Sequence, residues 1–112
     1  MADGLVRIFD TEENDRTLRF GDRRISITPA VEQAEGGPLS AYSARFGRGE
    51  RADLPAPYEE MWVVVHGRLL IRSGETAVRV GPGEFLHVPE RTPGEVEALE
   101  DTTLVCVSVP AH

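Results

Sequence analysis

The sequence has no lysine, and all twelve of its basic residues are arginine. A mechanism that forms a Schiff base on a lysine amine is therefore excluded. The chain has a single cysteine, Cys106, which rules out an intramolecular disulfide. Because Cys106 lies in the apolar run "TLVCVSVP", we expect a buried and unreactive thiol, which suits a reducing compartment.

Long apolar runs and basic clusters are absent as well. The opening stretch, "MADGLVRIFDTEENDR", is too polar for a signal peptide or a transmembrane helix, so we expect a cytoplasmic protein with no membrane contact. The formal net charge is -7. An acidic chain without a basic patch is unsuited to a phosphate backbone, which excludes nucleic acid as a partner.

Short apolar runs rich in β-branched residues make up most of the chain, and glycine or proline separates them. No amphipathic helix is predicted. Strands are predicted at "GLVRIFD", "RRISITPAV", "LSAYSARF", "EMWVVVHG", "RLLIRSG", "TAVRVG", "EFLHVP", "GEVEALE" and "TLVCVSVP". "WVVV" and "LVCVSV" are continuous, so we expect both faces of those strands to be covered. The pattern indicates an all-β sandwich, barrel or jelly roll.

Two spaced patterns resemble the motifs of the cupin family. The first cupin motif, G-x5-H-x-H-x3,4-E-x6-G, aligns with Gly47, Asp53, Pro55, Glu60 and Gly67. The second, G-x5-P-x-G-x2-H-x3-N, aligns with Gly83, Pro89, Arg91, Gly94 and Ala98. The resemblance implies a cupin double-stranded β-helix, a jelly-roll barrel. It implies a single domain over residues 1–112, with N-terminal strands and a loop in 1–38 and the barrel core in 39–112.

Within the cupins, "YEEMWVVVHGRLLIR", "GPGEFLHVPERT" and "VSVPAH" look most similar to the cupin domain of ethanolamine-utilisation EutQ-type proteins. That resemblance implies a metabolic role, with acyl-phosphate chemistry in some contexts. Cupins host many reactions, so the fold alone does not define the activity.

The resemblance also bears on metal binding, because a catalytic cupin holds a divalent metal with three histidines and a glutamate. Asp53, Pro55 and Gly94 replace those histidines here, and proline and glycine side chains cannot coordinate a metal. We therefore predict that the protein needs no metal and no other cofactor. A less favoured alternative is a Mn, Fe or Ni site formed by Asp53, Glu60 and His87.

Glu60 takes the position of the cupin glutamate, so it is predicted to point into the barrel mouth. A partly desolvated carboxylate is suited to general acid–base work, and we assign that role to Glu60 with His87 or Tyr58 as its counterpart. The alternative is a strand-end acid paired with arginine. Alternation along the strand directs Glu59 to the solvent.

Several further residues are predicted to bind the substrate. Trp62 and Val64 share the parity of Glu60, and Phe85 is expected to add an apolar wall. Arg45 and Arg72 lie on alternating strands, where a guanidinium could hold a carboxylate or phosphate. By contrast, the sequence gives no reason to assign a role to His112.

The candidate residues are acid–base groups, and the sequence shows no motif for an electron-carrying cofactor. This combination favours an isomerase, epimerase, lyase or cyclase that acts on a small organic metabolite. The alternatives are a metabolite-binding or accessory cupin without catalysis and a metalloenzyme with the Asp53, Glu60 and His87 ligand set. Small cupins often dimerise by exchanging an N-terminal strand. We therefore predict a homodimer in which "LVRIFD" is exchanged.

Overall fold

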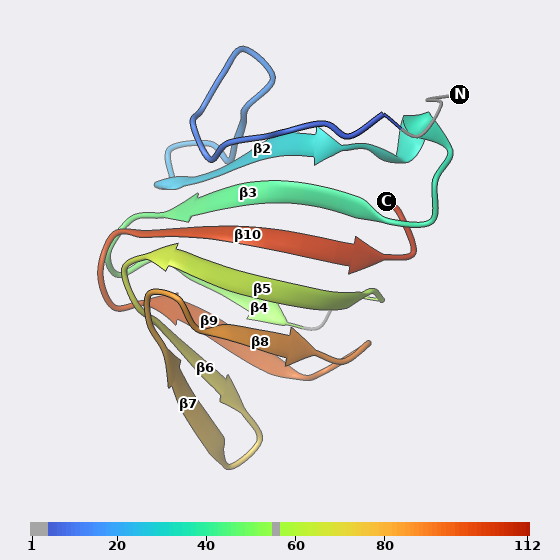
Figure 1. Ribbon diagram of the computed structural model, residues 1–112. Coiled ribbons are helices and arrows are strands. Elements are labelled where there is room, and N and C mark those ends of the chain that lie inside the picture. Colours follow the sequence, from blue (N-terminus) through green and yellow to red (C-terminus); the bar gives the residue numbers. More distant parts are fainter. Residues whose placement is uncertain (1–4, 55–56) are drawn as a thin grey trace.

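The computed structural model describes residues 5–54 and 57–112. Its regular structure is almost entirely β, arranged in two antiparallel sheets (Figure 1). The first sheet has the order β1-β2-β3-β10-β5-β8, and the second has the order β4-β9-β6-β7. Strands of the first sheet are β1 (Leu18–Arg19), β2 (Ile25–Val31), β3 (Ser40–Phe46), β5 (Glu59–His66), β8 (Phe85–Val88) and β10 (Thr102–Val109). Those of the second are β4 (Arg51–Leu54), β6 (Leu69–Ser73), β7 (Thr76–Val80) and β9 (Gly94–Ala98).

The predicted all-β class is confirmed, but one predicted strand does not form within the single chain. Residues 5–10, which belong to the predicted first strand, pair with no sheet. The one short helical segment described is the 3-10 turn η1 (Gln33–Glu35). No described helix is long and apolar enough to span a lipid bilayer.

Strands β5 and β10 form the centre of the first sheet, and burial alternates along both. Trp62 is paired with Cys106 and Val64 with Leu104, and these four side chains face the second sheet. The outer face stays partly exposed, although the continuous apolar sequence predicted cover on both sides. Met61, for example, is 37% exposed, because nothing in the described part of the chain forms a second layer over that face.

The core lies between the two sheets and is built from alternating strand residues. Its buried members come from both sheets: Ala44, Leu54, Trp62, Val64, Leu69, Ile71, Val80, Val88, Val96, Ala98, Leu104 and Cys106. Strands β2 and β3 lie at the end of the first sheet farthest from β6 and β7 (Figure 1). There Ile27 and Tyr42 are only partly buried.

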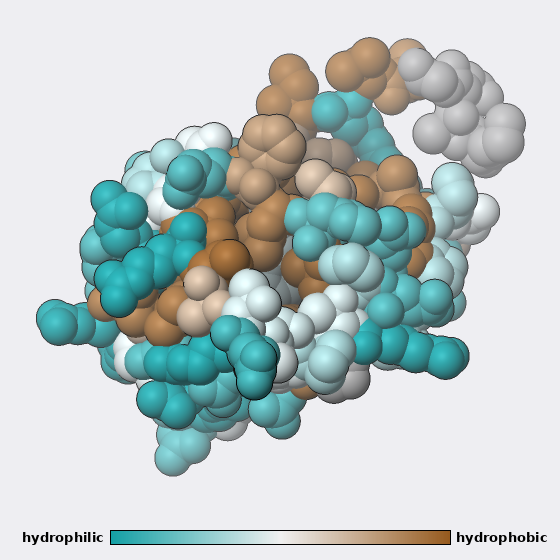
Figure 2. Space-filling model, turned by 90° about the horizontal axis from the view of Figure 1, so that it is seen from below, coloured by the Kyte–Doolittle hydropathy of each residue, from teal (hydrophilic) through white to brown (hydrophobic). Residues whose placement is uncertain are grey.

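The N-terminal segment carries large apolar side chains that the rest of the chain does not cover. Leu5, Val6 and Ile8 are each more than three-quarters exposed. Figure 2 shows the apolar side chains of this segment at the upper right, standing off the main body. Such exposure is unusual for a segment that stays free in solution.

Candidate functional site

The carboxylate of Glu60 is buried on the inner face of β5, with only 7% of the residue exposed. Its Oε1 atom accepts two hydrogen bonds, one from the indole Nε1 of Trp62 at 2.7 Å and one from the hydroxyl of Tyr42 at 3.0 Å. Trp62 lies two residues along the same strand, whereas Tyr42 comes from β3 across β10. A buried carboxylate without partners would be costly, and these two donors satisfy it.

Tyr42 remains protonated because its surroundings disfavour the phenolate. Burial raises the pKa of Tyr42 far above its usual range, and the neighbouring Cys106 thiol and Glu60 carboxylate add to the effect. The Ser108 hydroxyl lowers this pKa slightly, although it has no hydrogen-bond partner of normal geometry within residues 5–54 and 57–112. Burial, assisted by Glu60, likewise raises the pKa of the Cys106 thiol, so the cysteine is buried and unreactive as predicted.

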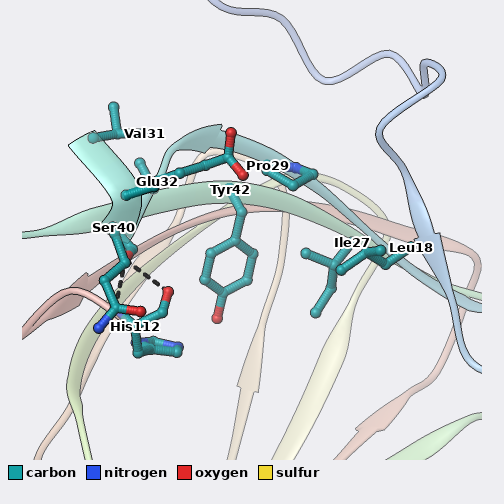
Figure 3. Close-up of a pocket in the computed structure, with 11 residues that line it drawn as sticks. Leu18, Ile27, Pro29, Val31, Glu32, Ser40, Tyr42 and His112 are labelled. Atoms are coloured by element: carbon teal, nitrogen blue, oxygen red, sulfur yellow. Dashed lines mark hydrogen bonds between the residues drawn. The ribbon is translucent and has the colours of Figure 1, made fainter.

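A pocket of about 450 Å³ lies beside Tyr42, over the inner face of β2 and β3. Its lining is mostly apolar: Leu18, Ile27, Pro29, Val31, Ala34 and Ala41, with Glu32, Gln33, Ser40, Tyr42 and His112 as polar members. Figure 3 shows the ring of Tyr42 between Ser40 and His112 on one side and Ile27 and Leu18 on the other. Tyr42 thus contacts both the pocket and the Glu60 carboxylate.

His87 does not lie near Glu60, and its predicted role as the counterpart of Glu60 is wrong. The β5–β8 register places His87 opposite Met61, whose side chain points away from the core. On that outer face His87 Nε2 lies 2.5 Å from Glu59 Oε2. Phe85 shares the face and is 67% exposed, so it does not wall the cavity either.

The remaining predicted residues of β5, and Tyr58 just before it, lie in separate environments. Trp62 and Val64 face inward as the alternation predicted, but Val64 is fully buried and neither residue lines the pocket. Tyr58 lies beside the pocket, where its ring stacks on the imidazole of His112. The ring centroids are 3.4 Å apart and the planes differ by 11°.

The two predicted anion-binding arginines point away from the pocket. Arg72 binds Glu95 at 3.1 Å and Glu97 at 2.9 Å on the outer face of the second sheet. The Glu97 carboxylate, with Glu95, raises the pKa of the Arg72 guanidinium. Arg45 donates to the carbonyl oxygen of Thr11 in the N-terminal segment. Both alternate with inward-facing residues, so strand geometry prevents either from reaching the pocket.

The alternative metal site is not assembled. Asp53 is exposed and alternates with the buried Leu54, so Asp53, Glu60 and His87 point in three different directions. No group of three or more histidine, cysteine or acidic side chains gathers among residues 5–54 and 57–112 in a way that could hold a metal.

The register of β4 also revises the motif alignment. The inward-facing residue of β4 is Leu54 and not Asp53. The first histidine position falls on Leu54 if only three residues separate the second histidine position from Glu60, but the glycine position then falls on Arg48 and Gly47 is no longer matched. In that alignment the second histidine position falls on residue 56. Residue 56 and the previously aligned Pro55 both lie outside the described residues. Leu54 pairs with Gly94, the position of the second-motif histidine.

No side chain fits at Gly94. Its φ is +134°, and a Cβ atom there would overlap the carbonyl oxygen of Arg72. The inward motif positions that the structure describes are therefore a leucine, a glycine and the already paired Glu60. These residues do not fit the metal that the cupin fold implies, since only one of them has a donor atom.

Sequence reasoning assigned a role to none of the residues that line the pocket, including its polar members Tyr42 and His112. Tyr42 could have been found, because it has the same parity as Ala44 in the alternating run "LSAYSARF", which was predicted to bury one face. No sequence pattern points to His112. Its place depends on how the segment after β10 folds back toward β3.

Comparisons with known proteins add to this geometry. No protein-family model matches the chain, and no curated protein matches it in sequence. Solved structures do match. The EutQ protein of Clostridium difficile has a TM-score of 0.71 at 18% identity over 78% of this chain and 63% of its own. KdgF from Halomonas sp. has a TM-score of 0.72 at 20% identity over 84% and 87%. Ectoine synthase from P. lautus has a TM-score of 0.80 at 13% identity over 94% and 78%.

These structures, with a cupin superfamily protein from Desulfitobacterium hafniense at a TM-score of 0.70, define the fold. The chain has the fold of a small cupin. Its similarity to EutQ, predicted from the strand sequences, is confirmed in the structure.

Proposed function

We propose that this protein binds a small uncharged or cationic organic molecule in the pocket beside Tyr42, and that Tyr42 and Glu60 together accept a proton from it. The single observation that carries the proposal is the position of Tyr42, which lines the pocket and hydrogen-bonds the buried carboxylate. A pocket of about 450 Å³ with an apolar wall and few polar groups is typical of a metabolite site.

The charge of the lining supports the ligand class. No arginine lines the pocket, and its one acidic member, Glu32, pairs with Arg16. The buried Glu60 carboxylate lies behind Tyr42. A phosphate or carboxylate would meet the negative charge of Glu60 with no arginine in the lining to bind it, whereas a hydroxyl or an ammonium group needs no such cation.

The hydrogen-bond direction supports the chemistry. Because an ionised carboxylate only accepts, the Tyr42 hydroxyl donates to Glu60, and its oxygen keeps a lone pair for a ligand in the pocket that Tyr42 lines. A ligand O–H or N–H can donate to that oxygen. Its proton can pass to Tyr42 while the phenol proton passes to Glu60, so Tyr42 stays neutral throughout. Isomerisation, epimerisation, elimination and cyclisation can all begin with such a step.

The alternative is a cupin that binds the same ligand without turning it over. Glu60→Gln separates the two functions, because a glutamine oxygen still accepts from Tyr42 and Trp62 but takes up no proton. Tyr42→Phe removes the contact itself. Isobutanol, isobutylamine and isobutyrate provide neutral, cationic and anionic head groups on one apolar body.

We expect isobutanol and isobutylamine to change the fluorescence of Trp62, the sole tryptophan, and isobutyrate to bind at least about tenfold more weakly. Tyr42→Phe should abolish these changes. Tighter binding of isobutyrate would refute the ligand class. With 3-hydroxybutan-2-one in D₂O, the wild-type protein should accelerate carbon-bound hydrogen exchange and Glu60→Gln should not. Equal exchange rates with retained affinity would favour the non-catalytic alternative.

A further inference from the structure

His112 is held in the pocket by contacts on three sides. The Ser40 hydroxyl, itself buried, accepts from the His112 backbone N–H at 2.8 Å and donates to its main-chain oxygen at 3.1 Å. Tyr58 stacks on one face of the imidazole. The neighbouring Ala111 N–H donates to the carbonyl of Pro38. The main chain at His112 is thus fixed, and the stack on Tyr58 orients the exposed imidazole for ligand contact.

A contact of the imidazole itself favours one tautomer. His112 Nδ1 lies 3.4 Å from the carbonyl oxygen of Pro110, and because a carbonyl can only accept, this long contact favours the neutral ring with the proton on Nδ1. The Nε2 atom then keeps its lone pair. No hydrogen bond to Nε2 comes from residues 5–54 or 57–112. His112 and Tyr42 both line the pocket, and in the view of Figure 3 the imidazole is drawn to the left of the phenol oxygen.

We propose that His112 Nε2 is a second ligand-binding acceptor of this pocket, acting beside Tyr42. The inference rests on the proposed function and makes its ligand more specific. Two acceptors in one apolar pocket select a molecule with two adjacent hydrogen-bond donors, such as a diol, an amino alcohol or a primary ammonium. A ligand with one hydroxyl leaves one acceptor without a direct partner.

The test compares isobutanol with 2-methylpropane-1,2-diol, which adds one hydroxyl to the same carbon skeleton. The protein is labelled with ¹⁵N-histidine, and the three histidines are assigned from single variants. We expect the free protein to show His112 in the Nδ1–H tautomer. We expect the diol to bind roughly five- to tenfold more tightly than isobutanol and to shift the His112 Nε2 signal.

Matched variants separate ligand contact from structure. His112→Phe keeps the stack on Tyr58 but removes Nε2, so it should erase the preference for the diol while isobutanol still binds. His66→Phe is the control, because His66 is exposed at the end of β5 and lines no part of this pocket. Tyr58→Phe should preserve the tautomer of His112, whereas Tyr58→Ala should release the ring.

The outcomes are distinct. Equal binding of both alcohols with an unmoved Nε2 signal, or an unchanged preference in His112→Phe, would overturn the role of His112 and leave the proposed function standing. An averaged tautomer in the free protein would also overturn it. If neither alcohol binds, or if both bind Tyr42→Phe as they bind the wild type, the proposed function fails and the inference fails with it.

Discussion

Raising the pH from 9 to 11 should destabilise this protein through two buried groups, Tyr42 and Cys106. Their ordinary pKa values are 10.0 and 9.0, and burial raises both well beyond this range in the folded state. Above the ordinary values the unfolded chain releases protons that the folded chain retains. Unfolding is therefore favoured as the pH rises, and the stability that these groups confer below pH 9 is progressively lost.

The size of the effect follows from linkage. Each group removes about 1.4 kcal/mol of unfolding free energy for every pH unit above its unfolded pKa. Between pH 9 and 11 the unfolding free energy falls over two pH units because of Cys106 and over one pH unit because of Tyr42. The total loss is about 4 kcal/mol. That is a large share of the stability of a small domain. Because the chain has no lysine, lysine ionisation does not contribute to the change in stability between these pH values.

Urea unfolding followed by far-UV circular dichroism, with a reductant present, measures the loss at each pH. Cys106→Ala should retain about 1.4 kcal/mol of the pH effect and Tyr42→Phe about 2.7 kcal/mol, and the double variant should lose almost all of it. The two groups interact, so the single variants need not add perfectly. A double variant that is as alkali-sensitive as the wild type would refute the reasoning.

Three further predictions concern the backbone, the metal and the assembly. Gly94→Ala should lower the unfolding free energy by more than about 3 kcal/mol. Gly74→Ala is the control and should lower it by only about 1 kcal/mol, because Gly74 has a φ of +61° but open space around it. Thermal melts measure both changes. Elemental analysis of untagged protein should find far less than one metal ion per chain. A stoichiometric metal would contradict the conclusion that the inward motif positions have too few donor atoms to hold one. Light scattering should show a homodimer that Ile8→Glu dissociates and Phe85→Glu does not. The opposite pattern would place the interface on the outer face of β5 and β8.

The sequence by itself determined the all-β class and the similarity to cupins. Short β-branched runs separated by glycine and proline leave few other folds open, because each run is too short and too regular in its alternation for a helix. The inward direction of Glu60 and Trp62 also followed from the sequence. Once Glu60 was aligned with the cupin glutamate, the two-residue period of the strand carried Trp62 to the same face.

Only the tertiary structure decided which partners Glu60 meets. Strand β8 has apolar residues on both of its faces, so its sequence pattern does not show which face His87 occupies. The pairing of β8 with β5 places His87 on the outer face. Asp53 was misplaced for a related reason, since the match to Gly47 fixed the first histidine position on Asp53, and only the structure shows that Leu54 is the residue of β4 that faces inward. Tyr42 lies 18 residues from Glu60 and across a third strand, and no local pattern encodes that contact. Contacts of this kind depend on the order of strands in the sheet, which is a property of the whole chain.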